Sequence, residues 1–99
     1  MPANIRFTEK ADSDLSSIAD FSFEAFGATQ TRKYLQSLHN AIEMLATFPK
    51  MGAARENIAP CLRMVVQGSH AIYYSEQTDG ILVERLLGPG QDPAREFES

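Results

Sequence analysis

The sequence predicts an α+β domain in which an antiparallel helical hairpin packs on one face of a small, mainly antiparallel sheet. Three observations lead to this β-α-α-β-β-β order. Residues 62–87 form three short runs rich in Val, Ile, Leu and Tyr, separated by two turn signals. Residues 9–48 carry apolar side chains at helical spacing, with a break at Gly27. A short strand candidate, residues 3–7, precedes them. We expect the 99 residues to form one domain.

The first strand candidate has only modest strand propensity. Alternation places Ile5 and Phe7 on one side and Asn4 and Arg6 on the other. We therefore expect residues 3–7 to pair beside the later strands.

The first helix is predicted over residues 9–26. Thr8 is its expected N-cap, and Glu9 and Asp12 place negative charge in the first turn, where the helix dipole favours it. Gly27 follows, at the position where a helix commonly ends with a residue in the left-handed backbone conformation. The expected apolar stripe consists of Ala11, Leu15, Ile18, Phe21 (or Ser22) and Ala25.

The second helix is predicted over residues 29–48, and Pro49 and Gly52 end it. Because only two residues separate the helices, they must fold back as an antiparallel pair. Their joint apolar face is expected to cover one side of the sheet. The stripe of the second helix consists of Tyr34, Leu38, Ala41, Ile42, Leu45 and Phe48.

The three later strands are predicted over residues 62–67, 70–76 and 81–87. Gly68-Ser69 suits a two-residue type II′ turn, and residues 77–80 suit a four-residue loop. This register places Arg63, Tyr74 and Arg85 on one face of the sheet. On the same face we expect Val65, Gln67, His70, Ile72, Ile81, Val83 and Leu87, and on the other Leu62, Met64, Val66, Ala71, Tyr73, Ser75, Leu82, Glu84 and Leu86.

Both sheet faces are substantially apolar in this register, although the chain has only one pair of helices to cover them. Residues 88–99 read as a polar tail with one large apolar residue, Phe97. We therefore expect some apolar sheet surface to remain open for a partner.

Composition narrows the classes of function. The chain is 43% hydrophobic with a net charge of −4, which argues against strong, sequence-independent nucleic-acid binding. A single cysteine, Cys61, excludes an intrachain disulfide and Cys-based metal motifs, and fits a reducing cytoplasm. No run approaches the length of a membrane span, and the N-terminus lacks the apolar core of a signal peptide.

Few residues suggest chemistry. Glu9, Asp12 and Asp14 are expected to be surface carboxylates that complement the helix dipole. His39 is expected to be exposed, and His70 to lie at a hairpin edge. Arg63 and Arg85, with Tyr74 between them, could bind a phosphate or carboxylate of a partner, or could form internal ion pairs.

The ordered set of segments resembles a ParE-type toxin of the ParE/RelE toxin–antitoxin superfamily. The similarity runs through FTEKADSDLSSIADF, then Gly27 with KYLQSLHNAIEMLATFPKMG, then LRMVVQGSHAIYYSE and ILVERLL. No single motif is specific, but the order over roughly ninety residues is typical of the family. The resemblance implies a RelE/ParE-like fold.

The resemblance also implies a cytoplasmic toxin that inhibits DNA gyrase by binding, without catalytic residues, metal or cofactor. A cognate ParD-like antitoxin, whose C-terminal segment folds on binding, would neutralise it. The implied target- or partner-binding residues are Arg63, His70, Tyr74 and Arg85. The implied antitoxin groove consists of Tyr34, Leu38, Ile42, Val65 and Ile72.

Two alternatives stay open. One is a RelE-like, ribosome-dependent mRNA endoribonuclease, but the chain is acidic and lacks most of the acid–base set that such chemistry needs. The other is a weakened or non-toxic antitoxin-binding homologue. Gly88 and Gly90 stand where many ParE relatives carry His and Arg, and this departure leaves open a weakened toxin or one with another target.

Overall fold

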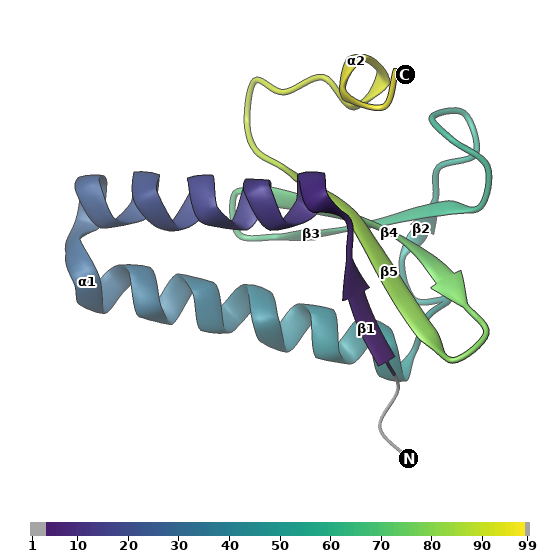
Figure 1. Cartoon of the computed structure of the whole chain (residues 1–99), viewed down its shortest axis with the longest axis horizontal. Helices are drawn as coiled ribbons and strands as arrows, with labels where there is room; N and C mark the ends of the chain where they lie inside the picture. Colours follow the sequence, from purple (N-terminus) through teal and green to yellow (C-terminus); the bar gives the residue numbers. More distant parts are fainter. Residues whose placement is uncertain (1–3, 99) are drawn as a thin grey trace.

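The computed structural model describes residues 4–98 and has the predicted α+β architecture (Figure 1). A five-stranded sheet has the order β1-β5-β4-β3-β2, antiparallel except for β1, which pairs parallel with β5. Ala3 of the predicted first strand and Ser99 of the predicted tail lie outside the described residues. The elements are β1 (Asn4–Phe7), α1 (Glu9–Thr47), β2 (Ala53–Ala54), β3 (Leu62–Gln67), β4 (His70–Gln77), β5 (Gly80–Leu87) and α2 (Pro93–Glu96).

Helix α1 is a helical hairpin with two antiparallel arms (Figure 1). Gly27, with φ 84° and ψ 177°, separates a first arm (residues 9–26) from a second arm (residues 28–47). Only glycine adopts this backbone region readily, so Gly27 sets where the chain reverses. Thr8 caps the first arm by accepting a hydrogen bond from Ala11 N at 3.0 Å. The same hydroxyl donates to Glu84 O at 2.7 Å, which ties the helix start to β5.

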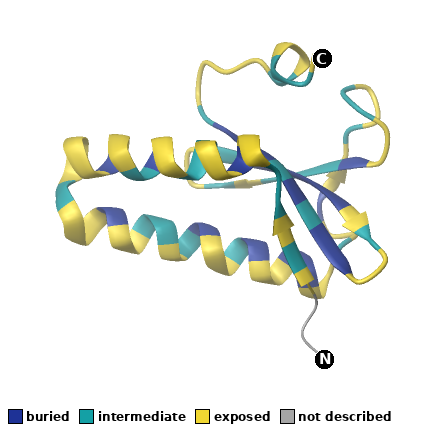
Figure 2. Cartoon of the chain, viewed as in Figure 1, coloured by how far each residue is buried: buried dark blue, intermediate teal, exposed yellow. Residues whose placement is uncertain are grey.

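The main core lies between the two arms and one sheet face (Figure 2). Ser22, not Phe21, occupies the inward position of the first arm, and Phe21 is exposed. Phe48 is also exposed, because it is the C-cap of α1 and has left the helical stripe. The buried members of this core are Ala11, Ile18, Leu38, Ile42, Leu45, Ala46, Ile72, Tyr74, Ile81, Val83 and Leu86.

A β-bulge in β5 changes the predicted register. Tyr74 pairs with Val83 and Tyr73 with Arg85, so Glu84 is an extra residue. From Arg85 onward, every side chain therefore lies on the face opposite to the predicted one. Leu86 joins the main core and Leu87 the other face, which reverses their predicted positions.

The chain itself covers most of the second sheet face, so the expected open apolar surface is reduced to the end of β3, where Val66 is 63% exposed. Leu62, Tyr73 and Leu87 are buried there. Phe97, which follows α2, packs on this face with its ring 5.4 Å from that of Tyr73. Ile58 and Ala59 from the loop before β3 complete the cover. The predicted polar tail therefore contains a short helix that helps to cover this face of the sheet.

Candidate protein-binding site

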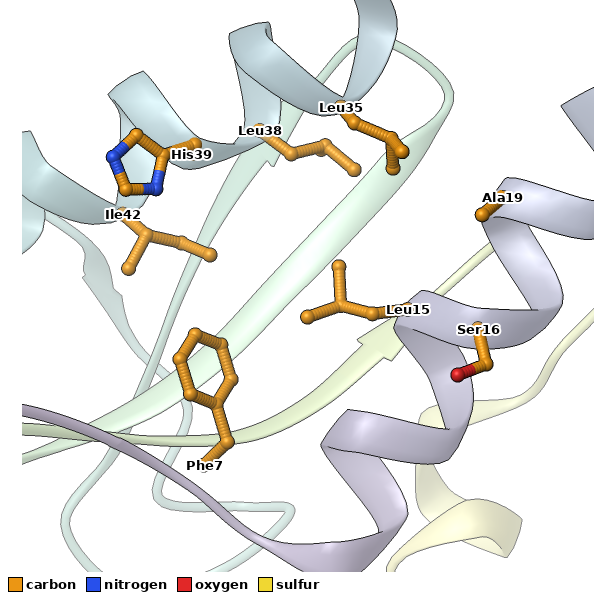
Figure 3. A pocket seen from close by; sticks show the side chains of 8 residues that line it. All are labelled: Phe7, Leu15, Ser16, Ala19, Leu35, Leu38, His39 and Ile42. Atoms are coloured by element: carbon orange, nitrogen blue, oxygen red, sulfur yellow. The ribbon is translucent and has the colours of Figure 1, made fainter. Parts of the chain in front are cut away.

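The helical hairpin carries an open groove between its two arms, which we call the arm groove (Figure 3). Its cavity volume is about 370 Å³. Leu15 and Ala19 reach in from the first arm, Leu35 and Leu38 from the second, and Phe7 lies at the base. Ser16, His39 and Ile42 complete the lining. The groove suits the apolar side chains of a docking segment.

A second and larger hollow, of about 730 Å³, lies between the first arm, the β3–β4 turn and the start of the tail. We call it the tail groove. Its lining mixes apolar and polar side chains, which suits a peptide that must be oriented as well as buried. The lining residues are Asp14, Ser17, Ile18, Phe21, Ser22, Phe26, Gln30, Tyr34, Ser69, His70, Leu86, Gly88, Pro89 and Gln91.

Tyr34 and His70 join the second arm to the β3–β4 turn inside the tail groove. The Tyr34 hydroxyl lies 2.5 Å from His70 Nδ1 and accepts a hydrogen bond from Ser69 N at 3.1 Å. A Cβ on Gly68 would meet the Tyr34 ring at 2.6 Å, and Gly68 has φ 60°, as the predicted type II′ turn requires. Burial lowers the pKa of His70 below its usual 6.5, while the charge of Asp14 opposes this shift. The ring is therefore neutral at pH 7.

Three phenylalanines stand exposed near the end of the first arm. Phe21, Phe23 and Phe26 are 70%, 59% and 65% exposed. Phe21 and Phe26 also border the tail groove. Single exposed apolar residues are common, but three aromatic rings within six residues beside a groove indicate a surface that meets another protein. The sequence predicted a place for only one of them, Phe21, and that was in the apolar stripe, although the three Phe of FSFEAF were an available signal.

The structure does not bring Arg63, Tyr74 and Arg85 into one site, because the β5 bulge turns Arg85 to the opposite face. Arg85 Nε and Nη2 donate to the Asp14 carboxylate at 2.8 and 2.9 Å, and Nη1 donates to Glu96 Oε1 at 3.0 Å. Asp14 also accepts from Leu86 N at 2.9 Å. Asp14 is therefore a structural anchor, and its predicted role as surface charge is wrong.

Arg63 and Tyr74 share a face, as predicted, but their polar atoms bind the chain's own backbone. Arg63 Nη1 donates to Gly52 O at 2.7 Å and to Lys50 O at 3.2 Å. The Tyr74 hydroxyl donates to Pro49 O at 2.7 Å and accepts from Gly52 N at 2.9 Å. Burial raises the pKa of Tyr74 above its usual 10.0, so the hydroxyl keeps its proton.

The five predicted groove residues separate into three environments. Leu38 and Ile42 line the arm groove, and Tyr34 lines the tail groove. Val65 is half-buried against the core, and Ile72 is completely buried in it, so neither belongs to an open groove. His39 is exposed, with its Nε2 3.3 Å from Glu43 Oε1, and borders the arm groove.

Residues 4–98 contain neither a cluster of metal-binding side chains nor a membrane-spanning helix. No group of three or more His, Cys, Asp or Glu side chains in this part of the chain is placed to hold a metal ion. No helix in the same range is both long and apolar enough to cross a membrane.

Comparisons with known proteins agree on one family. Residues 5–93 match the model of the ParE toxin of the type II toxin–antitoxin system parDE. Toxin ParE1 of Mycobacterium tuberculosis is 30% identical over 96 residues, which cover 96% of this chain and 98% of that protein. Toxin ParE1 of Caulobacter vibrioides is 35% identical over 69 residues, or 70% and 72% of the two chains. A structure described as the chromosomal ParDE TA system from P. aeruginosa superposes with a TM-score of 0.73 and 20% identity, over 88% of this chain and 96% of that one.

Proposed function

This chain belongs to the ParE toxin family of type II toxin–antitoxin systems, and on that premise we propose that it binds DNA gyrase and inhibits it. A cognate, ParD-like antitoxin neutralises it by occupying the helical hairpin. The observation that carries this proposal is the pair of grooves on the helical hairpin, with exposed phenylalanines beside the tail groove, on a chain that covers most of both faces of its own sheet. A toxin acting on gyrase works in the cytoplasm.

The antitoxin segment is expected to be an amphipathic helix in the arm groove that continues as a less regular stretch in the tail groove. Side chains at every third or fourth position of such a helix would enter between Leu15 and Leu38. The polar lining of the tail groove, including His70 and Gln91, would orient the continuing backbone. Folding of the segment on binding costs ordering entropy, which the apolar contacts must offset.

Binding is favoured over RNA cleavage by the state of the two arginines. A ribonuclease of the related type needs free cations to hold phosphate and an acid–base pair to move protons. Arg85 is instead held by the carboxylates of Asp14 and Glu96, and Arg63 donates from its Nη1 to backbone carbonyls. These contacts support a toxin that acts by occupying its target.

The proposal is tested with purified toxin, DNA gyrase and relaxed plasmid. The toxin should inhibit supercoiling or trap cleaved DNA, and adding the antitoxin should restore supercoiling. Ala19→Trp, which fills the arm groove, should weaken antitoxin binding, and Lys33→Glu on the outside of the second arm should not. Normal supercoiling at high molar excess of toxin would refute gyrase as target, and codon-dependent mRNA cutting on ribosomes would support the nuclease alternative.

Gly88 in the tail is relevant to whether the toxin is active or weakened. Gly88 N donates to Gln91 Oε1 at 2.8 Å, and a Cβ at Gly88 would lie 3.1 Å from His70 Nε2. Glycine therefore lets the tail pass close to His70. Expression of the chain without antitoxin separates the alternatives, since arrested growth supports an active toxin and normal growth supports a weakened homologue.

A further inference from the structure

We propose that the loop after α1, residues 48–52, presents the surface with which the chain holds an acidic, partly apolar patch on its target protein. We call this segment the anchored loop. The inference rests on the proposed function, because the target is the enzyme that the toxin inhibits. It assigns to Arg63 and Tyr74 the role of positioning residues that do not touch the target.

The anchored loop is fixed from below by a buried tyrosine. Tyr74 is completely buried, and its hydroxyl is shared between Pro49 O and Gly52 N. A Cβ at Gly52 would lie 2.5 Å from that hydroxyl, so only glycine allows the loop to approach the ring. Two points of the loop backbone are therefore held by one core side chain.

Arg63 fixes the loop from the side. Its Nη1 donates to the carbonyls of Gly52 and Lys50, and inside the loop Met51 N donates to Phe48 O at 3.0 Å. A loop with backbone hydrogen bonds at all five residues loses little entropy when it binds a partner. Such preorganisation is expected of a binding surface.

The side chains that this loop displays have no place in the core. Phe48 and Met51 are 56% and 51% exposed, and Lys50 lies exposed between them. Met44, one helical turn before Phe48, adds a third apolar side chain at 48% exposure. A rigid loop that holds aromatic and thioether groups in solvent has the composition of an interface centre.

The charge on the anchored loop favours an acidic partner. Between Met44 and Arg55 the sequence contains two cations and no acid, and Arg63 lies alongside as a third cation. Within the anchored loop Lys50 is the one charged side chain, and the nearest acids in the sequence, Glu43 and Glu56, lie outside the loop. Phe48 and Met51 would pack on apolar groups, which a nucleic-acid backbone does not offer; this favours a protein surface.

The anchored loop is separate from both grooves, since neither it nor Met44 contributes to their lining. Substitutions in the loop should therefore change inhibition of the target without changing affinity for the antitoxin. This separation is what an experiment can measure.

The experiment compares Lys50→Glu and Met51→Ser with the matched controls Lys33→Glu and Val66→Ser, which change exposed residues elsewhere. For each full-length variant, the concentration that half-inhibits gyrase supercoiling and the affinity for the purified antitoxin are measured. For the two loop variants we expect the concentration that half-inhibits gyrase to rise by about tenfold or more. The controls should match the unmodified chain, and antitoxin affinity should stay constant in all four. Tyr74→Phe should lose inhibition in the same way while it retains antitoxin binding.

Other results overturn the inference. Loop variants as inhibitory as the unmodified chain would exclude the loop from the target surface. An equal loss of inhibition and antitoxin affinity would place the loop in the antitoxin interface or in the fold. Retention of plasmid DNA by the toxin alone, lost in Lys50→Glu, would replace the acidic protein by nucleic acid. An unmodified chain that does not inhibit gyrase would instead refute the proposed function, and this inference with it.

Discussion

Arg85 of β5 and Asp14 of α1 form a two-pronged ion pair, with N–O distances of 2.8 and 2.9 Å, that closes the exposed edge of β5. β1 covers that edge only as far as Val83. Beyond it, Asp14 takes the place of a strand by accepting the Leu86 N–H. A helix side chain therefore continues the sheet where the first strand ends.

Arg85→Ala should destabilise the domain by about 3 kcal/mol, because it leaves the Asp14 carboxylate buried without its cation. The Asp14 side chain is only 12% exposed, so solvent is a poor replacement for the lost partner. Urea unfolding measures the change. Arg85→Lys should recover part of the lost stability, since lysine retains the positive charge but cannot make the two parallel hydrogen bonds of the guanidinium. Unchanged stability in Arg85→Ala would return Arg85 to the list of candidate target-binding residues.

Phe97→Ala should uncover the second face of the sheet. The ring packs edge-on against Tyr73, and its removal should cost about 2–3 kcal/mol, near the lower end of values for buried phenylalanine because Phe97 is only half-buried. The variant should also bind an apolar dye more strongly than the unmodified chain. If its unfolding midpoint were unaltered, α2 would not serve as a cover.

Gly27→Ala should destabilise the hairpin by about 1–3 kcal/mol, because a Cβ is strained at φ 84° and ψ 177°. Nothing lies within 4 Å of such a Cβ, so the cost is purely conformational. Ala28→Gly, at the neighbouring position, is the control that changes the turn without adding this strain. Equal thermal midpoints for Gly27→Ala and the unmodified chain would contradict the conformational argument.

Protonation of His70 should lower the free energy of unfolding in mild acid. Because burial lowers its folded-state pKa below the unfolded value of 6.5, the unfolded chain binds the extra proton first. The stability present above pH 6.5 is then lost progressively as the pH falls from 6.5 toward the lower, folded pKa. Thermal unfolding at a series of pH values should show this slope, and His70→Gln should flatten it.

Local patterns in the sequence were sufficient for most of the architecture. The periodicity of residues 9–47, the Thr8 cap and the Gly68-Ser69 turn are each determined by near neighbours, and the structure has all of them. The bulge at Glu84 could not be inferred in this way, because it depends on Thr8 and Asp14 reaching β5 from another element. That single extra residue separated Arg85 from Arg63 and removed the predicted two-arginine site.

The candidate site was less predictable than the fold. Leu38 and Ile42 were identified because one helical stripe serves both core and groove. The exposed phenylalanines were missed, since a periodicity argument assigns large apolar residues to the core. The tail's role as a cover was missed because four helical residues, Pro93–Glu96, give too short a pattern, although Asp92 caps them by accepting from Ala94 N at 3.1 Å.

The parallel pairing of β1 with β5 affects the order in which the molecule can be made. Asn4 of β1 pairs with Gly80 of β5, and Asp14 of α1 forms its ion pair with Arg85. Because the N-terminus leaves the ribosome first, the sheet cannot be completed until the residues of β5 have been translated. The helical arms, whose contacts are local, can form much earlier. The antitoxin that we propose would therefore meet a nascent chain in which the hairpin has formed and the last strand is still missing.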